Sequence, residues 1–471
     1  MSRLSSAGLA TVVSKLLTLA SLGVAARALG PESWGLAGSA VAAVAYASVL
    51  LSPGLTAWGT REIARDRQHA PAILVIVNLT QAVLACAAYF TVVALGQTLL
   101  EGPAARAVLL VSALALFAQA FSVDWAFEGL ERADVPARLQ ASLSAARLAA
   151  VVWLCRSPAD VLAYAAILPL FLGAHALAGS VLLFREGCLR LLWPGWARLR
   201  RGLAAAWPLG AAMALFLLIH NANTLIVQGW HGSRAAGQYL AALRLVEMAS
   251  VLPGIAGSVL RPRLARLSWT DPAAAARESR LYARAHLLAG WLLAPAVFAE
   301  APRIIAWIYG GQYTEAVPLL RIFSVAMLAN YLVCGYTSCL VAFGRDRVLL
   351  RSMVIAGVVS IGAGLLLTPW WGAAGAALSA SLMHPAGLLA ALPEYRRTVG
   401  SLDFAAWKLP CAAAAALVAL SWLLESHGVS TGWRVGCCFS VYLAIAGRCW
   451  MALQQGAVNT MTGGAHACPQ S

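Results

Sequence analysis

The sequence predicts an all-α, polytopic membrane protein with about fourteen transmembrane helices. Hydrophobic residues make up 61% of the 471 residues and charged residues only 11%, which is more apolar surface than a soluble core can bury. The apolar residues come in continuous runs of about twenty, the length at which an α-helix crosses a bilayer. They do not alternate with polar residues as the strands of a membrane β-barrel do. A barrel is therefore excluded.

Fourteen apolar spans can be placed along the chain. The first is too long for the core of a signal peptide and is expected to remain as a helix. The ninth is short, and the segment 300–310 after it is expected to form an interfacial helix, because Pro302 suits a first helical turn. The predicted spans are 7–28, 36–57, 72–97, 106–128, 137–155, 160–184, 204–228, 238–260, 285–300, 318–343, 352–370, 373–391, 406–424 and 434–453.

The basic residues predict the orientation of these spans. Most of the 34 lysines and arginines lie in the even-numbered loops and the two tails, so both termini are expected in the cytoplasm. The first hairpin agrees. Gly30 and Pro31 predict a turn at the outer face, with Trp34 at the headgroup level, and Arg61 and Arg65 end the second span at the inner face.

The chain contains an internal repeat. The segment G-P-E-S-W-G at Gly30–Gly35 has the same glycine spacing as G-S-R-A-A-G at Gly232–Gly237, and a Pro-Gly pair follows each copy at 53–54 and 253–254. Both copies enter a span in the same direction, which indicates a parallel repeat. It predicts two pseudo-symmetric six-helix lobes around a central cavity, plus two C-terminal helices. The expected domains are lobes at 1–185 and 204–391, a basic cytoplasmic linker at 186–203, the two last helices at 406–453 and a disordered cytoplasmic tail at 454–471.

Composition also excludes several classes of function. The net charge of +15 comes from scattered arginines rather than one basic face, so no nucleic-acid partner is expected. The ten cysteines form no C-x-x-C motif, and no metal or cofactor is expected. No loop exceeds about 25 residues, so the chain is not expected to be an enzyme, and no catalytic residue is assigned.

Four motifs together resemble one family. They are A-R-A-L-G-P-E-S-W-G with G-T-R-E-I-A-R in the first hairpin, D-W-A-F-E-G-L-E-R at Asp124–Arg132, N-A-N-T-L-I-V-Q-G at Asn221–Gly229 and I-Y-G-G-Q-Y-T-E-A at Ile308–Ala316. In order and spacing they resemble the bacterial polysaccharide-biosynthesis flippases of the O-antigen type, members of the multidrug/oligosaccharidyl-lipid/polysaccharide exporter superfamily. The resemblance spans about residues 5–400 and implies a two-lobe architecture of twelve to fourteen helices.

The resemblance implies a function and its partners. The expected activity is translocation of undecaprenyl-diphosphate-linked oligosaccharide to the periplasmic leaflet by alternating access, in the bacterial inner membrane. Expected partners are this lipid-linked oligosaccharide, membrane lipid and other polysaccharide-assembly proteins. The alternatives are a membrane-embedded polymerase or ligase for lipid-linked sugars, and a multidrug exporter of the same superfamily. Drug exporters tend to carry an acid in the first helix, where this chain has Lys15, which argues against that alternative.

An anionic diphosphate crossing hydrocarbon requires counter-charges, so cations inside spans are the first candidates for a substrate cavity. Lys15 lies mid-span, and its alternative is a structural ion pair, for example with Asp124. Arg147 and Arg244 are equally open to a phosphate-binding and a structural interpretation. Arg27 lies beside the Gly-Pro turn, where an interfacial anchor is the alternative.

Polar residues inside spans complete the candidates. His220, Asn221 and Asn223 can bind sugar hydroxyls or bond across helices, and family members often carry an acid at the position of Asn223. Three acids are candidates for ion coupling, namely Asp124, Glu128 and Glu247. Asp124 and Glu128 share a helix face and have pairing with loop arginines as their alternative, whereas Glu247 can pair with Arg244 three residues before it.

Two further histidines and four tryptophans are interpreted as structural residues. His175 and His384 are isolated in the sequence and are interpreted as packed neutral side chains. Tryptophans near span ends are typical of interfacial belts, with sugar stacking as the alternative. These are Trp125, Trp230, Trp370 and Trp371.

Overall fold

In the computed structural model of the protein, helices account for nearly all described residues, and no strand occurs among them. The structure describes residues 2–49, 51, 54–100, 102–185, 196–343, 345–400 and 423. The α-helices are α1 (Ser2–Ser48), α2 (Leu55–Arg65), α3 (Ala70–Leu99), α4 (Pro103–Ala113), α5 (Ala115–Ala120), α6 (Asp124–Gly129), α7 (Asp134–Leu154), α8 (Val161–Arg185), α9 (Trp196–Ala249), α10 (Val251–Thr270), α11 (Pro272–Ile308), α12 (Ala316–Ala342) and α13 (Asp346–Thr398), with short 3-10 helices at Arg67–His69, Pro158–Asp160 and Gly311–Tyr313.

The helices have the length and composition of membrane spans. Seven helical segments of the described chain are long and apolar enough to cross a bilayer. The all-α membrane fold is therefore confirmed. The predicted spans 406–424 and 434–453 and the tail 454–471 lie outside the described residues, apart from Leu423. Part of the predicted linker also does, and α9 begins at Trp196, before the predicted start of its span.

The chain divides into two compact units. Unit 1 contains Met1–Ala241, Ile305–Ala316 and Ile361–Ala376, and unit 2 contains Ala242–Ile304, Val317–Ser360 and the chain from Ala377 onward. Four helices, α9, α11, α12 and α13, contribute residues to both units, α12 with only its first residue, Ala316, in unit 1. The predicted lobes at 1–185 and 204–391 stay a prediction.

The predicted turn at Gly30 is confirmed. Gly30 has φ 73° and ψ 168°, which divides α1 into two helices, residues 2–29 and 31–48. A side chain would be strained at this positive φ. The second of these helices ends before the predicted limit of 57, and Leu55–Arg65 forms the separate amphipathic helix α2 after Gly54. Trp34 was expected at the headgroup level, but it is buried against Tyr164 with ring centroids 5.6 Å apart.

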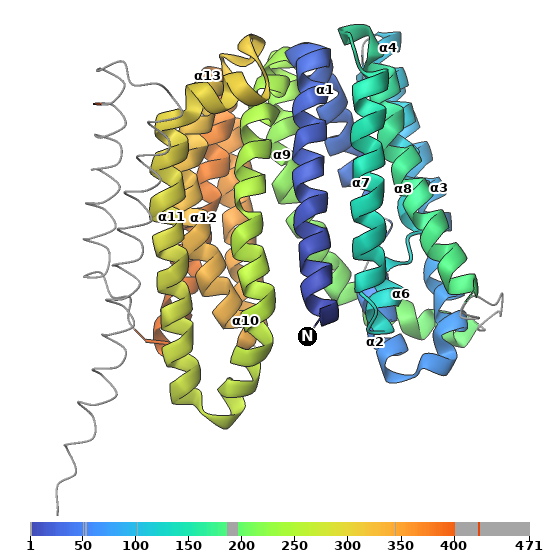
Figure 1. Cartoon of the computed structure of the whole chain (residues 1–471), viewed down its shortest axis with the longest axis vertical. Helices are drawn as coiled ribbons and strands as arrows, with labels where there is room; N and C mark the ends of the chain where they lie inside the picture. Colours follow the sequence, from blue (N-terminus) through green and yellow to red (C-terminus); the bar gives the residue numbers. More distant parts are fainter. Residues whose placement is uncertain are drawn as a thin grey trace, which may run out of the picture. The chain divides into compact units, whose positions relative to one another are not determined.

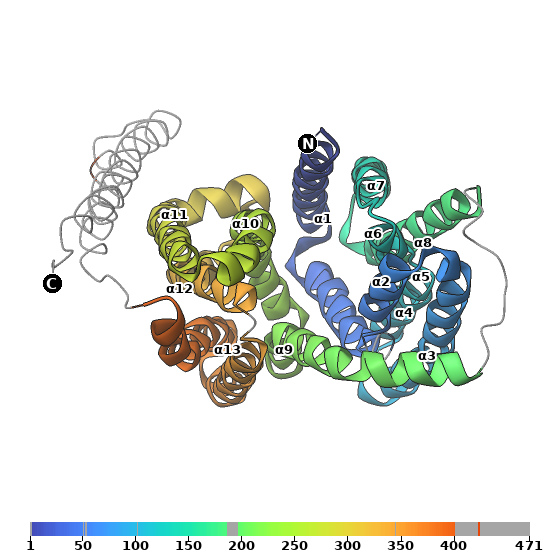
Figure 2. The ribbon, with the colours of Figure 1, turned by 90° about the horizontal axis from the view of Figure 1, so that it is seen from below.

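The predicted fourth span, 106–128, is confirmed as an apolar helical segment, Pro103–Gly129, long enough to cross a bilayer, but it is not one continuous helix. It is broken into α4, α5 and α6, at Leu114 and again at 121–123. Neither break contains glycine or proline, so packing rather than local sequence causes them. At the second break α8 comes close, because a side-chain carbon on Gly179 would lie 2.8 Å from Val123. Figure 2 shows α4 and α5 between α3 and α8, and these helices are in contact.

Helices α1 and α7 lie side by side in Figure 1 and are in contact. A hydrogen bond of 2.9 Å between the Ser14 and Ser144 hydroxyls joins them at a buried position. Such serine contacts are common between membrane helices, where small side chains allow close approach. α8 follows α7 through the 3-10 turn at Pro158–Asp160 and packs against it.

The internal repeat is visible in the backbone of unit 1. Gly232 has φ 77° and ψ −178°, nearly the conformation of Gly30, and breaks α9 as Gly30 breaks α1. The second glycines of the two motifs contact each other. A side-chain carbon on Gly35 would lie 1.8 Å from the Ser233 carbonyl oxygen, and one on Gly237 would lie 1.8 Å from that of Pro31. The two turns therefore pack backbone against backbone.

The later helices differ from prediction at two points. The predicted eighth span, 238–260, is not one helix, because α9 ends at Ala249 and α10 begins at Val251. The short ninth span and the interfacial helix after it were wrong, because Pro272–Ile308 forms one helix that contains both Pro295 and Pro302. In contrast, α13 breaks at Gly372, φ 59°, between the predicted eleventh and twelfth spans. In unit 2, buried aromatic rings form part of the core, and Tyr336 packs edge-on against Tyr395 at 4.2 Å.

Tryptophan exposure partly follows the predicted belt. Trp230, Trp370 and Trp371 are exposed, as interfacial side chains are. Trp125 is buried, so its assignment to the belt was wrong.

Candidate functional site

Arg147 is the most unusual charged residue among the candidates. It follows Ser144 by three residues and precedes Val151 by four on α7, and both neighbours are buried, so it shares the packed face of this helix. Its Nε and Nη2 atoms are hidden from solvent and have no hydrogen-bond partner in the described part of the chain. Tyr164 of α8 lies close enough to interact with it electrostatically. Arg147 thus places positive charge inside unit 1.

Lys15 lies next to this position on the neighbouring helix. Ser14 points from α1 toward α7, and Lys15, the following residue, is exposed together with Leu16. Because consecutive residues on a helix are 100° apart, Lys15 does not enter the α1–α7 interface. The structure places the two cations on adjacent helices, with Arg147 enclosed and Lys15 open. No contact between Lys15 and Asp124 is found among the described residues.

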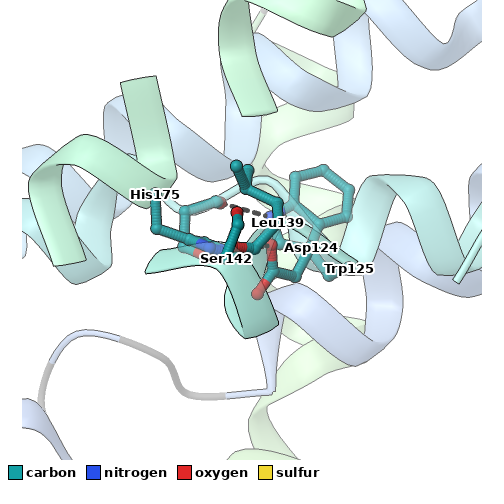
Figure 3. Close-up of polar contacts among 6 residues, drawn as sticks. Asp124, Trp125, Leu139, Ser142 and His175 are labelled. Carbon is teal, nitrogen blue, oxygen red and sulfur yellow. Dashed lines mark hydrogen bonds and ion pairs between the residues drawn. The ribbon is translucent and has the colours of Figure 1, made fainter. Parts of the chain in front are cut away.

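Asp124 has a partner that the sequence analysis missed. The Nε2 atom of His175 lies 2.8 Å from Oδ1 of Asp124, which joins α8 to the first turn of α6 (Figure 3). The His175 side chain is 7% exposed and that of Asp124 44%. Pairing with loop arginines was therefore wrong for Asp124, and His175 is not isolated. The two residues are 51 positions apart, and no local pattern links them.

The surroundings of this pair hold it in place. Trp125 is buried beside Asp124, and its indole N–H donates to the Ser122 carbonyl at 3.0 Å. Figure 3 shows Ser142 and Leu139 of α7 near the pair. Glu128, one turn beyond Asp124, is exposed. A carboxylate and an imidazole in contact inside a span can hold or exchange a proton, so both remain candidates for coupling.

The polar cluster of α9 is spread around its helix. Asn223 is buried, Asn221 is half-buried and His220 is exposed. His220 and Asn223 are three residues apart and so lie on neighbouring positions of the helix surface, whereas Asn221 is turned by about 100° from His220. A sugar-binding role for the three residues stays a prediction.

Arg244 and Glu247 in unit 2 form the expected local pair. Nη1 of Arg244 lies 2.6 Å from Oε2 of Glu247, and both side chains are about three-quarters buried. The pair neutralises both charges within one turn of helix.

Arg27 differs from the other candidate cations in its contacts. Its guanidinium donates to the carbonyl oxygens of Ile308, at 2.9 Å, and of Trp307, which are the last carbonyls of α11. A helix leaves its last carbonyl groups without intrahelical donors, and a cation there also interacts favourably with the helix dipole. Arg27 is therefore a helix-capping residue in this structure.

Long apolar helices, three of them broken at glycines, define a multi-pass α-helical membrane protein. The chain belongs to the polysaccharide biosynthesis protein family, whose model matches residues 4–268. No curated protein sequence matches the chain.

Solved structures share the fold. The structure of the lipid II flippase MurJ in an inward closed conformation matches with a TM-score of 0.77 and 10% sequence identity, covering 97% of this chain and 99% of that one. An inward-facing multidrug resistance MATE transporter of the MOP superfamily matches with a TM-score of 0.59 and 14% identity, covering 82% and 94%. A MATE transporter of Vibrio cholerae matches with a TM-score of 0.55 and 16% identity, covering 85% and 97%. At these identities the likeness establishes the fold.

Proposed function

We propose that this protein is a flippase that moves undecaprenyl-diphosphate-linked oligosaccharide from the cytoplasmic to the periplasmic leaflet by alternating access. The observation that carries the proposal is the combination of family and fold: a polysaccharide biosynthesis protein that has the fold of a lipid II flippase. The cargo must cross about 30 Å of hydrocarbon with its sugars and diphosphate. Its prenyl tail can remain in lipid throughout.

Arg147 supports an anionic cargo. A buried guanidinium with unpaired N–H groups destabilises the fold unless an anion or a polar group accepts hydrogen bonds from these N–H groups. A phosphate oxygen is a suitable partner, because guanidinium binds phosphate through parallel N–H···O bonds. We propose that Arg147 binds the diphosphate after α1 and α7 separate locally, and that the exposed Lys15 makes the first contact. Arg244 and the α9 amides are candidates for later contacts.

The fold likeness to MATE transporters supports a multidrug exporter as the second candidate. The two candidates differ in charge preference. Exporters of cationic drugs require acids in their cavity, whereas Lys15 and Arg147 favour an anion. A polymerase or ligase acting on the same lipid-linked sugars remains an outcome of the test below.

The test measures the leaflet in which the cargo resides. In cells that lack this protein, intact lipid-linked oligosaccharide should accumulate in the cytoplasmic leaflet. In a separate assay, the purified protein in proteoliposomes should transfer this glycolipid from one leaflet to the other. Accumulation of unpolymerised lipid-linked sugar in the outer leaflet would instead indicate a polymerase or ligase. Export of a cationic dye without transfer of the glycolipid would indicate a drug exporter.

We also propose an inner-membrane location with both termini in the cytoplasm, based on the arginine distribution. Reporter fusions test this orientation directly. A fusion within residues 185–201 should be active only with a cytoplasmic reporter, and periplasmic reporter activity there would invert the topology.

A further inference from the structure

The turn at Gly30 and the end of α11 cap each other. Arg27 donates to the carbonyls of Trp307 and Ile308, at the C-terminus of α11. In return, Gln312 Nε2 donates to the Arg27 carbonyl at 2.7 Å, and the Tyr313 hydroxyl donates to the Ala26 carbonyl at 2.9 Å. Ala26 and Arg27 lie near the end of the first helix of α1, so each of two helix C-termini receives donors from the other.

These contacts join distant parts of the chain. The bonded positions are separated by 280 to 287 residues, and all of them lie in unit 1. α11 belongs to unit 2 up to Ile304 and to unit 1 from Ile305, and the chain returns to unit 2 after Ala316. The capping segment therefore stands at the point where two helices pass from one unit to the other.

The two repeat motifs lie next to these contacts. Gln238, next to Gly237, donates to the Gln312 carbonyl at 3.0 Å. The Gly35–Gly237 contact described above brings the turns at Gly30 and Gly232 together without side chains between them. Tyr313 is fully buried, whereas Arg27 is exposed. The contact is therefore buried at Tyr313 and open to solvent at Arg27.

We propose that Arg27, Gln312 and Tyr313 form a releasable latch that holds the turn at Gly30 against the end of α11, and that the latch opens when the cargo leaves. This inference rests on the proposed transport function. The latch consists of a few hydrogen bonds rather than an extensive apolar core, and each such bond shifts an equilibrium by about fivefold. Its loss therefore changes the population of closed protein without removing the core of the fold. Arg27 is then a residue of the latch and not of the substrate cavity.

The test measures opening without requiring a cargo. Ala26 is fully buried in the closed protein, so a cysteine at Ala26, in a background whose native cysteines are replaced by alanine, reports opening by its rate of maleimide labelling in detergent. Tyr313→Phe and Gln312→Ala each remove one bond and should speed labelling about fivefold, and Arg27→Ala removes two bonds and should speed it about 30-fold. Tyr313→Phe also keeps the shape of the core.

The matched control is Arg156→Ala. Arg156 also donates to a C-terminal helix carbonyl, that of Trp153, but within its own turn. Its substitution should leave labelling at Ala26 unchanged. A cysteine at the equally buried Ala120 should remain unlabelled in every variant, which separates opening from unfolding. Labelling at Ala26 that is the same in all latch variants, or that Arg156→Ala accelerates equally, would overturn the latch.

A second measurement links the latch to transport. Cysteines replacing Arg27 and Gln312, joined by a short bis-methanethiosulfonate that forms a disulfide with each thiol, should stop glycolipid transfer, and a reductant that cleaves these disulfides should restore it. Full transfer by the cross-linked protein would overturn the latch. If labelling responds as expected but no variant, nor the unsubstituted protein, transfers lipid-linked oligosaccharide, the latch stands and the proposed cargo fails.

Discussion

Replacing Arg147 with methionine is expected to stabilise the protein and to abolish transport. The substitution removes two buried nitrogen donors, Nε and Nη2, that have no hydrogen-bond partner among the described residues. Each unsatisfied buried group costs about 1–3 kcal/mol, so their removal should add at least about 2 kcal/mol. Methionine is flexible and apolar and can fill most of the space that the arginine occupied. A residue retained at such a cost is expected to serve the cargo rather than the fold.

The magnitude can be expressed as a melting temperature. At about 2.1 cal/mol/K per residue, the 471-residue chain has an unfolding entropy of about 1 kcal/mol/K, so 2 kcal/mol corresponds to a rise in Tm of about 2 °C. The assay is thermal unfolding of the purified protein in detergent, alongside glycolipid transfer in proteoliposomes. Arg147→Lys should keep part of the transfer activity.

Arg138→Met is the matched control on the same helix. Arg138 is exposed and pairs with Asp134 four residues before it, and such surface pairs contribute about 0–1 kcal/mol. Its substitution should not raise Tm and should leave transfer intact. A lower Tm for Arg147→Met, or full transfer by that variant, would refute the assignment of Arg147 to the cargo.

Three further predictions concern the repeat contact, the Asp124–His175 pair and Lys15. Gly35→Ala and Gly237→Ala place a carbon 1.8 Å from a carbonyl oxygen and should sharply reduce the yield of folded protein, whereas Gly173→Ala, with nothing within 4 Å, should be neutral or slightly stabilising in the same size-exclusion assay. His175→Ala should lower Tm more than Asp124→Asn, because an amide oxygen still accepts from His175 whereas alanine leaves a gap and an unpaired carboxylate; equal losses would contradict this role for the pair. Lys15→Ala should abolish glycolipid transfer while Lys15→Arg retains some, and full transfer by both at normal protein levels would exclude phosphate binding by Lys15.

Local sequence patterns predicted the partner of a candidate residue only where the two residues lie close together along the chain. Arg244 and Glu247 are three residues apart, so helix geometry alone brings them together, as the structure shows at 2.6 Å. The Asp124–His175 pair and the Ser14–Ser144 bond join residues 51 and 130 positions apart. Nothing in the local pattern indicates such partners. Arg27 was identified as a functional candidate, but its role as a cap depends on carbonyls about 280 residues away.

The sequence by itself determined the membrane fold class, the turn at Gly30 with its repeat at Gly232, and the boundary between the spans 352–370 and 373–391, where α13 breaks at Gly372. These features depend on composition and on backbone conformations that only glycine adopts readily, and both can be seen in a short window. Only the tertiary structure decided the breaks inside the fourth span, the continuity of α11 across two prolines, and the partners of the charged residues. These depend on which helices pack together, because in a low-dielectric interior a polar group takes its partner from whichever helix lies against it.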